Sequence, residues 1–120
     1  MISSLKPNEI FVFGSNRAGI HGAGAARTAA RLFGASHGVG EGRTGRCYAV
    51  PTKDERLLTL PLSDIKESID RLGEHAREHP GLDFLVTAIG CGYAGYDYDR
   101  DILPLLGNLP ENCKLIPPER

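Results

Sequence analysis

The sequence predicts an α/β domain with a mostly parallel sheet. Two observations predict it: apolar runs of strand length alternate with helical patterns, and the strongest of these runs is almost wholly apolar. Alternation of strands and helices favours parallel pairing, and a continuous apolar run is typical of a strand buried on both faces. At 120 residues the chain has the length of one domain, so residues 1–120 are assigned to a single unit.

The first predicted strand covers residues 10–13 (IFVF), an apolar run that ends at Gly14. The alanine-rich segment 22–33 then predicts a helix, because alanine has the highest intrinsic helix propensity. We expect Leu32 and Phe33 to anchor the buried face of this helix.

A glycine-rich loop is expected at residues 35–45, followed by a second strand at residues 47–50 (CYAV). Pro51 ends this strand, since proline has no N–H group to donate to a sheet ladder. Ser63 or Asp64 caps the next helix, whose apolar residues recur at i, i+4, i+7 and i+11 and so share one face. These apolar residues are Ile65, Ile69, Leu72 and Ala76.

Residues 84–89 (FLVTAI) are the strongest strand candidate and predict a central parallel strand. Asp101 is expected to cap a short third helix with an apolar side. The apolar residues of that helix are Ile102, Leu105, Leu106 and Leu109. A last strand is expected at residues 114–116.

Composition and charge narrow the classes of protein that fit this chain. Hydrophobic residues make up 41% and charged residues 24%, which is ordinary for a folded globular domain. With a formal net charge of −1, the chain has no overall positive potential that would attract nucleic acid or membranes. No apolar run approaches the roughly 20 residues that span a bilayer, and three widely spaced cysteines indicate neither a disulfide framework nor a metal knuckle. We therefore expect a soluble, cytoplasmic protein without membrane contact, metal or cofactor.

Glycine and charge are unevenly distributed along the chain. Of the 15 glycines, nine fall between Gly14 and Gly45 and three between Gly90 and Gly95, where they build loops whose backbone approaches a ligand closely. Residues 1–60 carry eight Lys and Arg against four Asp and Glu, whereas residues 61–120 carry six against eleven. An anionic small molecule therefore suits the first, positively charged half.

The first three predicted strands each end in residues suited to binding. These are residues 14–16 (GSN), 51–53 (PTK) and 90–92 (GCG). Ligands of such sheets lie beyond the carboxyl ends of the strands. We therefore expect the three segments to converge on one cleft.

The predicted helix at residues 22–33 begins with His21-Gly22-Ala23-Gly24. Bare backbone N–H groups at a helix start form a site for phosphate, while close packing of the helix explains the same glycines. The dinucleotide-binding fingerprint requires a third glycine where Arg27 stands, so the spacing does not match that motif. Contact with phosphate or ribose and close packing both remain open.

The segment Gly90-Cys91-Gly92-Tyr93-Ala94-Gly95-Tyr96 directly follows the third predicted strand. Three glycines in six residues increase the backbone entropy lost on folding, so a purely structural turn explains them poorly. Backbone amides wrapped around a diphosphate explain them better, with Tyr93 or Tyr96 covering a ribose or base. No histidine is near Cys91 in the sequence, so we interpret it as a small buried thiol that holds the loop.

Lys53 follows Thr52 at the end of the second predicted strand. A lysine that faces a closed pocket pairs with phosphate, or attacks an aldehyde carbon as a nucleophile. Spacing alone favours a solvated lysine that pairs with Asp54 or Glu55.

His75 and His79 are four residues apart and share a helix face. The HExxH motif of zinc proteases needs a glutamate after the first histidine, where this chain has Ala76. We interpret the two histidines as solvent-facing residues near a helix end, where a positive charge is favourable.

Residues 90–97 (GCGYAGYD), together with the upstream segment 50–53 (VPTK), resemble the macrodomain family. The resemblance is to the branch of ADP-ribosyl hydrolases that use a catalytic lysine. This branch includes the antitoxin macrodomains, which remove ADP-ribose from DNA bases, and the terminal ADP-ribose–protein glycohydrolase. Residues 16–24 are similar to the asparagine and glycine-rich helix start that hold the distal ribose there. The resemblance spans residues 10–107 and implies a compact three-layer α/β/α fold.

By this resemblance, Lys53 is the catalytic lysine, which attacks the anomeric carbon of the distal ribose. The resemblance also implies a ligand-binding set: Asn16, Gly22 and Gly24 at the distal ribose, Gly90, Cys91, Gly92 and Gly95 at the diphosphate, and Thr52, Tyr93 and Tyr96 as further contacts. The glycohydrolase branch has an acidic residue where this chain has Ala94. Asp97 matches an acidic position of the antitoxin branch, so Asp97 and His21 are the candidates for moving protons.

The leading hypothesis is a protein that binds ADP-ribose or an ADP-ribosylated substrate and hydrolyses the ADP-ribosyl linkage through Lys53. The alternative is a binder without catalytic activity that captures ADP-ribose-derived nucleotides, which the alanine at position 94 favours. A third interpretation is recognition of a modified base on nucleic acid. It depends on the antitoxin resemblance, because the net charge gives no support for broad DNA affinity.

Overall fold

Five strands form one mixed sheet in the order β2-β3-β1-β4-β5 in the computed structural model. β1 (Glu9–Asn16) lies at the centre and pairs in parallel with β3 (Cys47–Lys53) and with β4 (Asp83–Val86). β5 (Cys113–Leu115) pairs in parallel with β4, whereas β2 (Gly42–Thr44) pairs antiparallel with β3. The expectation of an α/β fold is therefore confirmed; the sheet is parallel from β3 to β5 and has an antiparallel edge at β2.

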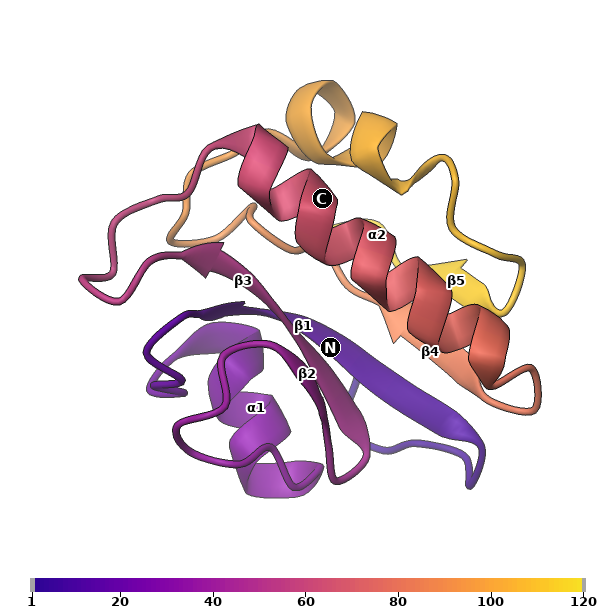
Figure 1. Cartoon of the computed structure of the whole chain (residues 1–120). Helices are drawn as coiled ribbons and strands as arrows, with labels where there is room; N and C mark the ends of the chain where they lie inside the picture. Colours follow the sequence, from indigo (N-terminus) through magenta and orange to yellow (C-terminus); the bar gives the residue numbers. More distant parts are fainter. Residues whose placement is uncertain (1, 120) are drawn as a thin grey trace.

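The structure describes residues 2–119, and its helices lie on both faces of the sheet (Figure 1). α1 (Gly24–Leu32) covers one face, and α2 (Leu62–Glu78) covers the other. Two short helical segments, η1 (Tyr98–Ile102) and η2 (Leu103–Leu106), lie on the same side as α2. The chain therefore has two hydrophobic cores, one on each side of the sheet.

Side chains along β1 alternate between the two cores, because successive residues of a strand point to opposite faces. Ile10 and Val12 pack in the core under α2, together with Phe84 of β4. Phe11 and Phe13 pack in the core under α1, whose contribution is mainly the small residue Ala29. A small residue at that position lets the helix lie close to the sheet.

The predicted apolar face of α2 is confirmed, since all four residues of the stripe are buried. The predicted cap is wrong: the helix begins at Leu62, and Pro61 occupies the N-cap position. Asp64 lies in the first turn, where a negative charge is favourable, and its carboxylate pairs with Arg17 at 3.4 Å.

α1 begins two residues later than predicted, and its buried residues are Ala26 and Ala29. The prediction for Leu32 is wrong, because this side chain is 56% exposed. Phe33 is buried as expected, but it follows the helix at the C-cap position. The close approach of α1 to the sheet leaves room for alanine rather than leucine on the buried face.

β3 continues through Pro51 to Lys53, so the prediction that the strand ends at proline is wrong. β2 pairs with β3 only as far as Ala49, and the register between β1 and β3 shifts between Ser15 and Asn16, beside Pro51. Proline is tolerated in strands at edges and at irregularities of this kind. β2 itself was not predicted, because its three residues lie in the expected loop 35–45 and carry no apolar alternation.

The third predicted strand is shorter than expected, because β4 ends at Val86. The Thr87 hydroxyl donates to the Val12 carbonyl at 2.7 Å and the Thr87 backbone N–H donates to the same oxygen at 3.2 Å. After this point the backbone turns away toward the glycine loop. The predicted helix capped by Asp101 is instead η1 and η2, and Asp97 provides the cap by accepting from the Arg100 N–H at 2.8 Å.

All three cysteines are free thiols. Burial raises the pKa of Cys47 and of Cys113 to about 11 each. Among residues 2–119, no helix combines the length and the apolar character needed to cross a membrane. The same residues contain no group of three or more His, Cys, Asp or Glu side chains arranged to hold a metal ion.

His75 and His79 stack on one another with ring centroids 4.3 Å apart. His75 also contacts Tyr48 of β3 and Phe84 of β4, at centroid distances of 5.3 Å and 5.6 Å. The interpretation of His75 as solvent-facing is therefore wrong, since His75 packs against the sheet and its Nε2 is buried without a hydrogen bond, whereas His79 is partly exposed. Burial, the neighbouring His79 and Arg43 lower the pKa of His75, with a smaller opposing effect of Glu78.

This environment predicts a loss of stability in mild acid. The pKa of His75 lies below its ordinary value of 6.5 in the folded chain, so the unfolded chain binds the proton more tightly. The free energy of unfolding is therefore expected to fall as the pH decreases below 6.5 toward the folded-state pKa. Urea unfolding of the wild type and His75→Phe at several pH values checks this. If the free energy of unfolding changed with pH equally in the wild type and in the variant over this range, His75 would not be the cause of the pH dependence.

Candidate functional site

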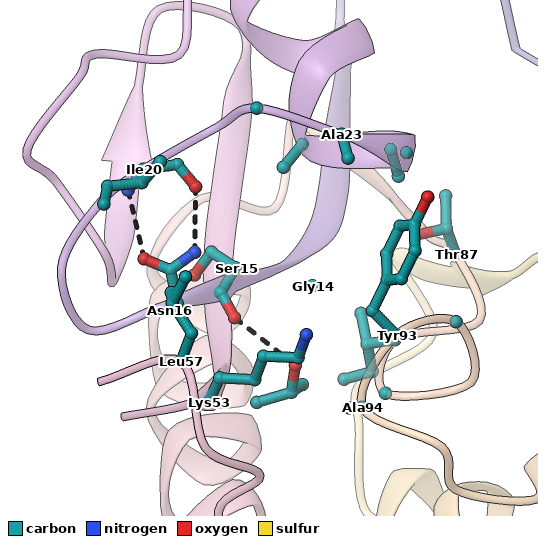
Figure 2. A pocket seen from close by; sticks show the side chains of 18 of the residues that line it. Gly14, Ser15, Asn16, Ile20, Ala23, Lys53, Leu57, Thr87, Tyr93 and Ala94 are labelled. Atoms are coloured by element: carbon teal, nitrogen blue, oxygen red, sulfur yellow. Dashed lines mark hydrogen bonds between the residues drawn. The ribbon is translucent and has the colours of Figure 1, made fainter. Parts of the chain in front are cut away.

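A pocket of about 360 Å³ lies at the carboxyl ends of β1, β3 and β4. All three segments that the sequence analysis expected to converge contribute to it, with Asn16, Lys53 and Gly90 as examples. The start of α1 supplies a further wall through residues 22–26. Figure 2 shows Asn16 and Lys53 on one side of this pocket and Tyr93 on the other.

Gly14 lies where two walls of the pocket meet. A Cβ atom at Gly14 would lie 3.4 Å from the Gly90 nitrogen and 3.6 Å from the Ile89 Cα. The end of β1 therefore lies beside backbone of the segment after β4, at ordinary van der Waals distance from such a Cβ.

The loop between β1 and α1 is fixed by the side chain of Asn16. Its Nδ2 donates to the Ile20 carbonyl at 2.8 Å, and its Oδ1 accepts from the Ile20 N–H at 3.0 Å (Figure 2). A second support is a backbone contact, because the Gly38 N–H donates to the Gly19 carbonyl at 2.9 Å. Asn16 thus lines the pocket, but both polar atoms of its side chain hold the loop.

α1 begins at the pocket without a side-chain cap and without an acidic residue in its first turn. The hydrogen-bond ladder of the helix begins where the Arg27 N–H donates to the Ala23 carbonyl, at 3.2 Å. The backbone N–H groups of the preceding turn therefore have no acceptor within the helix. Such a helix start carries a partial positive charge and binds anions. The expectation for Gly22 and Gly24 agrees with their position here, since both line the pocket.

Lys53 lies at the end of β3, and its Nζ is 5.4 Å from the centroid of the Tyr93 ring. Asp54 does not pair with it, because the Asp54 carboxylate accepts from the N–H groups of Arg56 at 2.8 Å and Leu58 at 3.0 Å. Within residues 2–119, the ammonium group of Lys53 has no carboxylate at ion-pair distance. The interpretation that spacing alone favoured, a lysine paired with Asp54 or Glu55, is therefore wrong.

Tyr93 is the aromatic residue among the described residues that line the pocket, and 78% of its surface is exposed. Its ring lies close to the start of α1, since a Cβ at Gly24 would be 3.9 Å from the Tyr93 Cε2. The loop that carries Tyr93 begins at Gly90, whose φ of +77° favours glycine. Tyr93 thus lies at the mouth of the pocket between Lys53 and α1.

The serine and threonine hydroxyl groups on the pocket wall each donate to a backbone carbonyl. Ser15 donates to Gly40, Thr52 donates to Ser15 at 3.3 Å, and Thr87 donates to Val12 at 2.7 Å. No acidic residue is among the described residues that line the pocket. Among the described residues that line the pocket, Lys53 is therefore the only one whose side chain carries a formal charge.

The two candidates for moving protons do not line the pocket. His21 is buried: its Nε2 lies 3.1 Å from the Ser36 carbonyl, and its ring lies edge-on to Phe13 with centroids 5.4 Å apart. Asp97 is exposed and caps η1. The carboxylate of Asp97 and the imidazole of His21 thus have structural partners elsewhere.

Three residues expected at the diphosphate or ribose also lie outside the pocket lining: Cys91, Gly95 and Tyr96. The Tyr96 hydroxyl donates to the Leu60 carbonyl at 2.6 Å, so this side chain holds the glycine loop against the segment before α2. The Cys91 thiol donates to the Ile89 carbonyl at 3.5 Å, and burial raises its pKa. Its role as a structural thiol is consistent with both observations. The remaining predicted contacts, Thr52, Gly90, Gly92 and Tyr93, line the pocket.

Sequence reasoning missed several lining residues, of which Ile20 and Leu57 are the most distinctive. Both are apolar and 46% exposed. Ile20 follows Gly19 in the β1–α1 loop, where the sequence shows no periodic pattern of apolar residues. Leu57 has a φ of +64°, which no sequence pattern indicates for a leucine. Neither residue had a signal beyond its apolar character.

The arrangement suits an anionic ligand with rings. The positive charge of Lys53 and the start of α1 attract phosphate groups, and the exposed side chains of Ile20, Leu57 and Tyr93 offer apolar surface at the mouth. An amine at this place also acts as a nucleophile toward an electrophilic carbon when it is neutral. Comparison of this chain with protein-family models, with curated proteins and with solved structures finds no match.

Proposed function

We propose that this chain is a macrodomain-like protein that binds ADP-ribose or an ADP-ribosyl group in the pocket at the carboxyl ends of β1, β3 and β4. The observation that carries the proposal is that Lys53, both glycine-rich segments and the uncapped start of α1 line one pocket with no acidic residue on its described walls. The family part of the proposal rests on the sequence resemblance around Lys53 and Gly90.

A diphosphate fits the electrostatics of this pocket. Backbone N–H groups at the start of α1 and in the glycine loop after β4 provide donors without the bulk of side chains. The space beside Gly22 and Gly92 is open, because a Cβ atom added at either residue would have no other atom within 4 Å. This space is available to such a ligand. Lys53 adds a full positive charge at the same pocket.

Lys53 is the residue we assign to hydrolysis. In its neutral form the amine attacks the anomeric carbon of the distal ribose, and the bond to the carrier breaks as the bond to nitrogen forms. The carrier leaves with the electron pair of the broken bond and takes up the proton that the nitrogen loses. Water then releases the ribose from the lysine. The ligand-binding part of the proposal does not depend on this step.

A second candidate function is binding without turnover. It is favoured by the placement of Asp97 and His21, neither of which lines the pocket, and by Ala94, which lines it where an acidic residue stands in the glycohydrolase branch. In this case Lys53 neutralises ligand charge and forms no covalent bond.

Calorimetric titration with ADP-ribose, AMP and NAD tests the binding. We expect ADP-ribose to bind at least about tenfold more tightly than AMP, because AMP reaches only part of the site; that ratio corresponds to about 1.4 kcal/mol. Affinity for ADP-ribose is also expected to decrease with added salt, as charge neutralisation by Lys53 requires. Equal affinity for the three ligands, or no heat with any of them, would rule out the proposal.

A further inference from the structure

Leu57 is the one residue other than glycine that has a positive φ, +64°, among residues 2–119. It lies in the turn between β3 and α2, and its side chain lines the pocket while remaining 46% exposed. A positive φ is disfavoured for a residue with a Cβ atom. Strained backbone of this kind persists where the surrounding structure fixes it, and such places are concentrated at ligand sites.

Asp54 fixes the conformation of this turn. Its carboxylate accepts from the N–H groups of Arg56 and Leu58, at 2.8 Å and 3.0 Å. Its backbone N–H donates to the Leu58 carbonyl at 2.8 Å, and its carbonyl accepts from the Leu57 N–H at 3.0 Å. Four hydrogen bonds from one residue therefore hold Leu57 in the positive φ region.

The turn is also bound to two walls of the pocket. Thr59 pairs with Lys53 as an antiparallel bridge, so the strand end that carries the lysine continues into the turn. The Thr59 hydroxyl donates to the Ala94 carbonyl at 3.1 Å, which joins the turn to the glycine loop that carries Tyr93. The position of Leu57 relative to Lys53 and Tyr93 is therefore fixed by the fold.

Leu57 and Tyr93 come from different walls of the pocket, and the amine end of Lys53 projects into the space between the walls (Figure 2). The exposed fractions of Leu57 and Tyr93 are 46% and 78%, so both side chains can bury apolar surface when a ring enters the pocket. A ribose ring presents C–H groups on its faces, and an exposed leucine provides a matching apolar surface.

We propose that Leu57 determines specificity by packing on a face of the distal ribose of ADP-ribose. This inference rests on the proposed function, because it is the assignment of Lys53 to the anomeric carbon that places the distal ribose beside the lysine. The strained turn holds the leucine side chain in the pocket. The neighbouring Leu58 is 60% exposed, does not line the pocket and lacks a positive φ, so it provides a matched control.

The test compares ADP-ribose with ADP, which lacks the distal ribose, on the wild type, Leu57→Gly and Leu58→Gly. We expect Leu57→Gly to weaken binding of ADP-ribose about fivefold, the effect of losing part of a leucine contact. Its affinity for ADP is expected to stay within about twofold. The Tm of Leu57→Gly is expected within about 3 °C of the wild type, because relief of the positive φ offsets the loss of contacts. Leu58→Gly leaves both affinities unchanged.

Equal weakening of ADP-ribose and ADP by Leu57→Gly would overturn the assignment to the distal ribose. Unchanged affinity for both ligands in Leu57→Gly would overturn any role of Leu57 in binding, while the proposed function would stand on wild-type binding. Leu57→Asn repeats the test with a residue that tolerates positive φ, so a folding failure of the glycine variant does not decide the result. Wild-type protein that binds neither ligand would overturn both proposals.

Discussion

Replacing Lys53 with alanine is expected to reduce turnover of ADP-ribosylated substrates by about 10³-fold or more, since no other described residue of the pocket provides an amine nucleophile. Stability is expected to change by less than about 0.5 kcal/mol, because Lys53 makes no ion pair within residues 2–119 and only a cation–π contact with Tyr93. Release of ADP-ribose from modified protein and from modified DNA measures the turnover, and thermal unfolding measures the stability.

Lys53→Arg separates catalysis from binding. Arginine keeps the positive charge but is not deprotonated in proteins, so it cannot act as the nucleophile. If Lys53 is the nucleophile, the arginine variant keeps affinity for ADP-ribose within a few-fold while turnover stays as low as in Lys53→Ala. Turnover by Lys53→Ala at the wild-type rate would contradict the lysine mechanism, and wild-type protein that binds ADP-ribose without turnover would establish the binder.

Gly19→Ala is expected to destabilise the protein by about 3 kcal/mol and to abolish ligand binding. A Cβ atom at Gly19 would lie 2.2 Å from the Gly38 carbonyl carbon, and the φ of Gly19 is +70°. The clash is with backbone, which cannot move aside as a flexible side chain can. The β1–α1 loop, which carries Ile20 and is held by the side chain of Asn16, must therefore shift. Urea unfolding and ADP-ribose titration measure the two effects.

Two further glycines serve as controls for this clash. Gly38 has a φ of +89° but open space around its missing Cβ, so Gly38→Ala isolates the backbone strain, about 1 kcal/mol. Gly22 has neither a positive φ nor a neighbour within 4 Å, so Gly22→Ala is expected to keep the stability of the wild type. If Gly19→Ala were no more destabilised than Gly38→Ala, the close backbone contact would not explain the need for glycine.

The parts of the fold that follow from the sequence are those whose signal is local and repeated. The face of α2 could be read from apolar residues at helical spacing, and the strands at residues 10–13 and 47–50 from short apolar runs. β2 could not be found, since a three-residue edge strand is held by its partner rather than by its own pattern. The extension of β3 through Pro51 depends equally on where its neighbours stop pairing.

The candidate site could be located but not completed. Lys53 and the glycines at 22, 24 and 90 were expected at strand and helix ends, and topology brings such ends together. The roles of Asp97, His21 and Tyr96 depend on which way side chains point and which partners they meet, and residue type does not determine this. The Nε2 atom of His21 and the hydroxyl of Tyr96 contact backbone carbonyls, which no motif spacing records.

Among the five strands of the described sheet, β1 is synthesised before the two strands that pair with it, β3 and β4. Its ladder with β3 needs residues up to 53, and its ladder with β4 needs residues up to 86. A nascent chain that has exposed only the first 60 residues therefore carries a strand with one open edge, which is a template for pairing with another chain. The last wall of the pocket is formed by residues 87–94, so a ligand can stabilise the fold only after residue 94 has been synthesised.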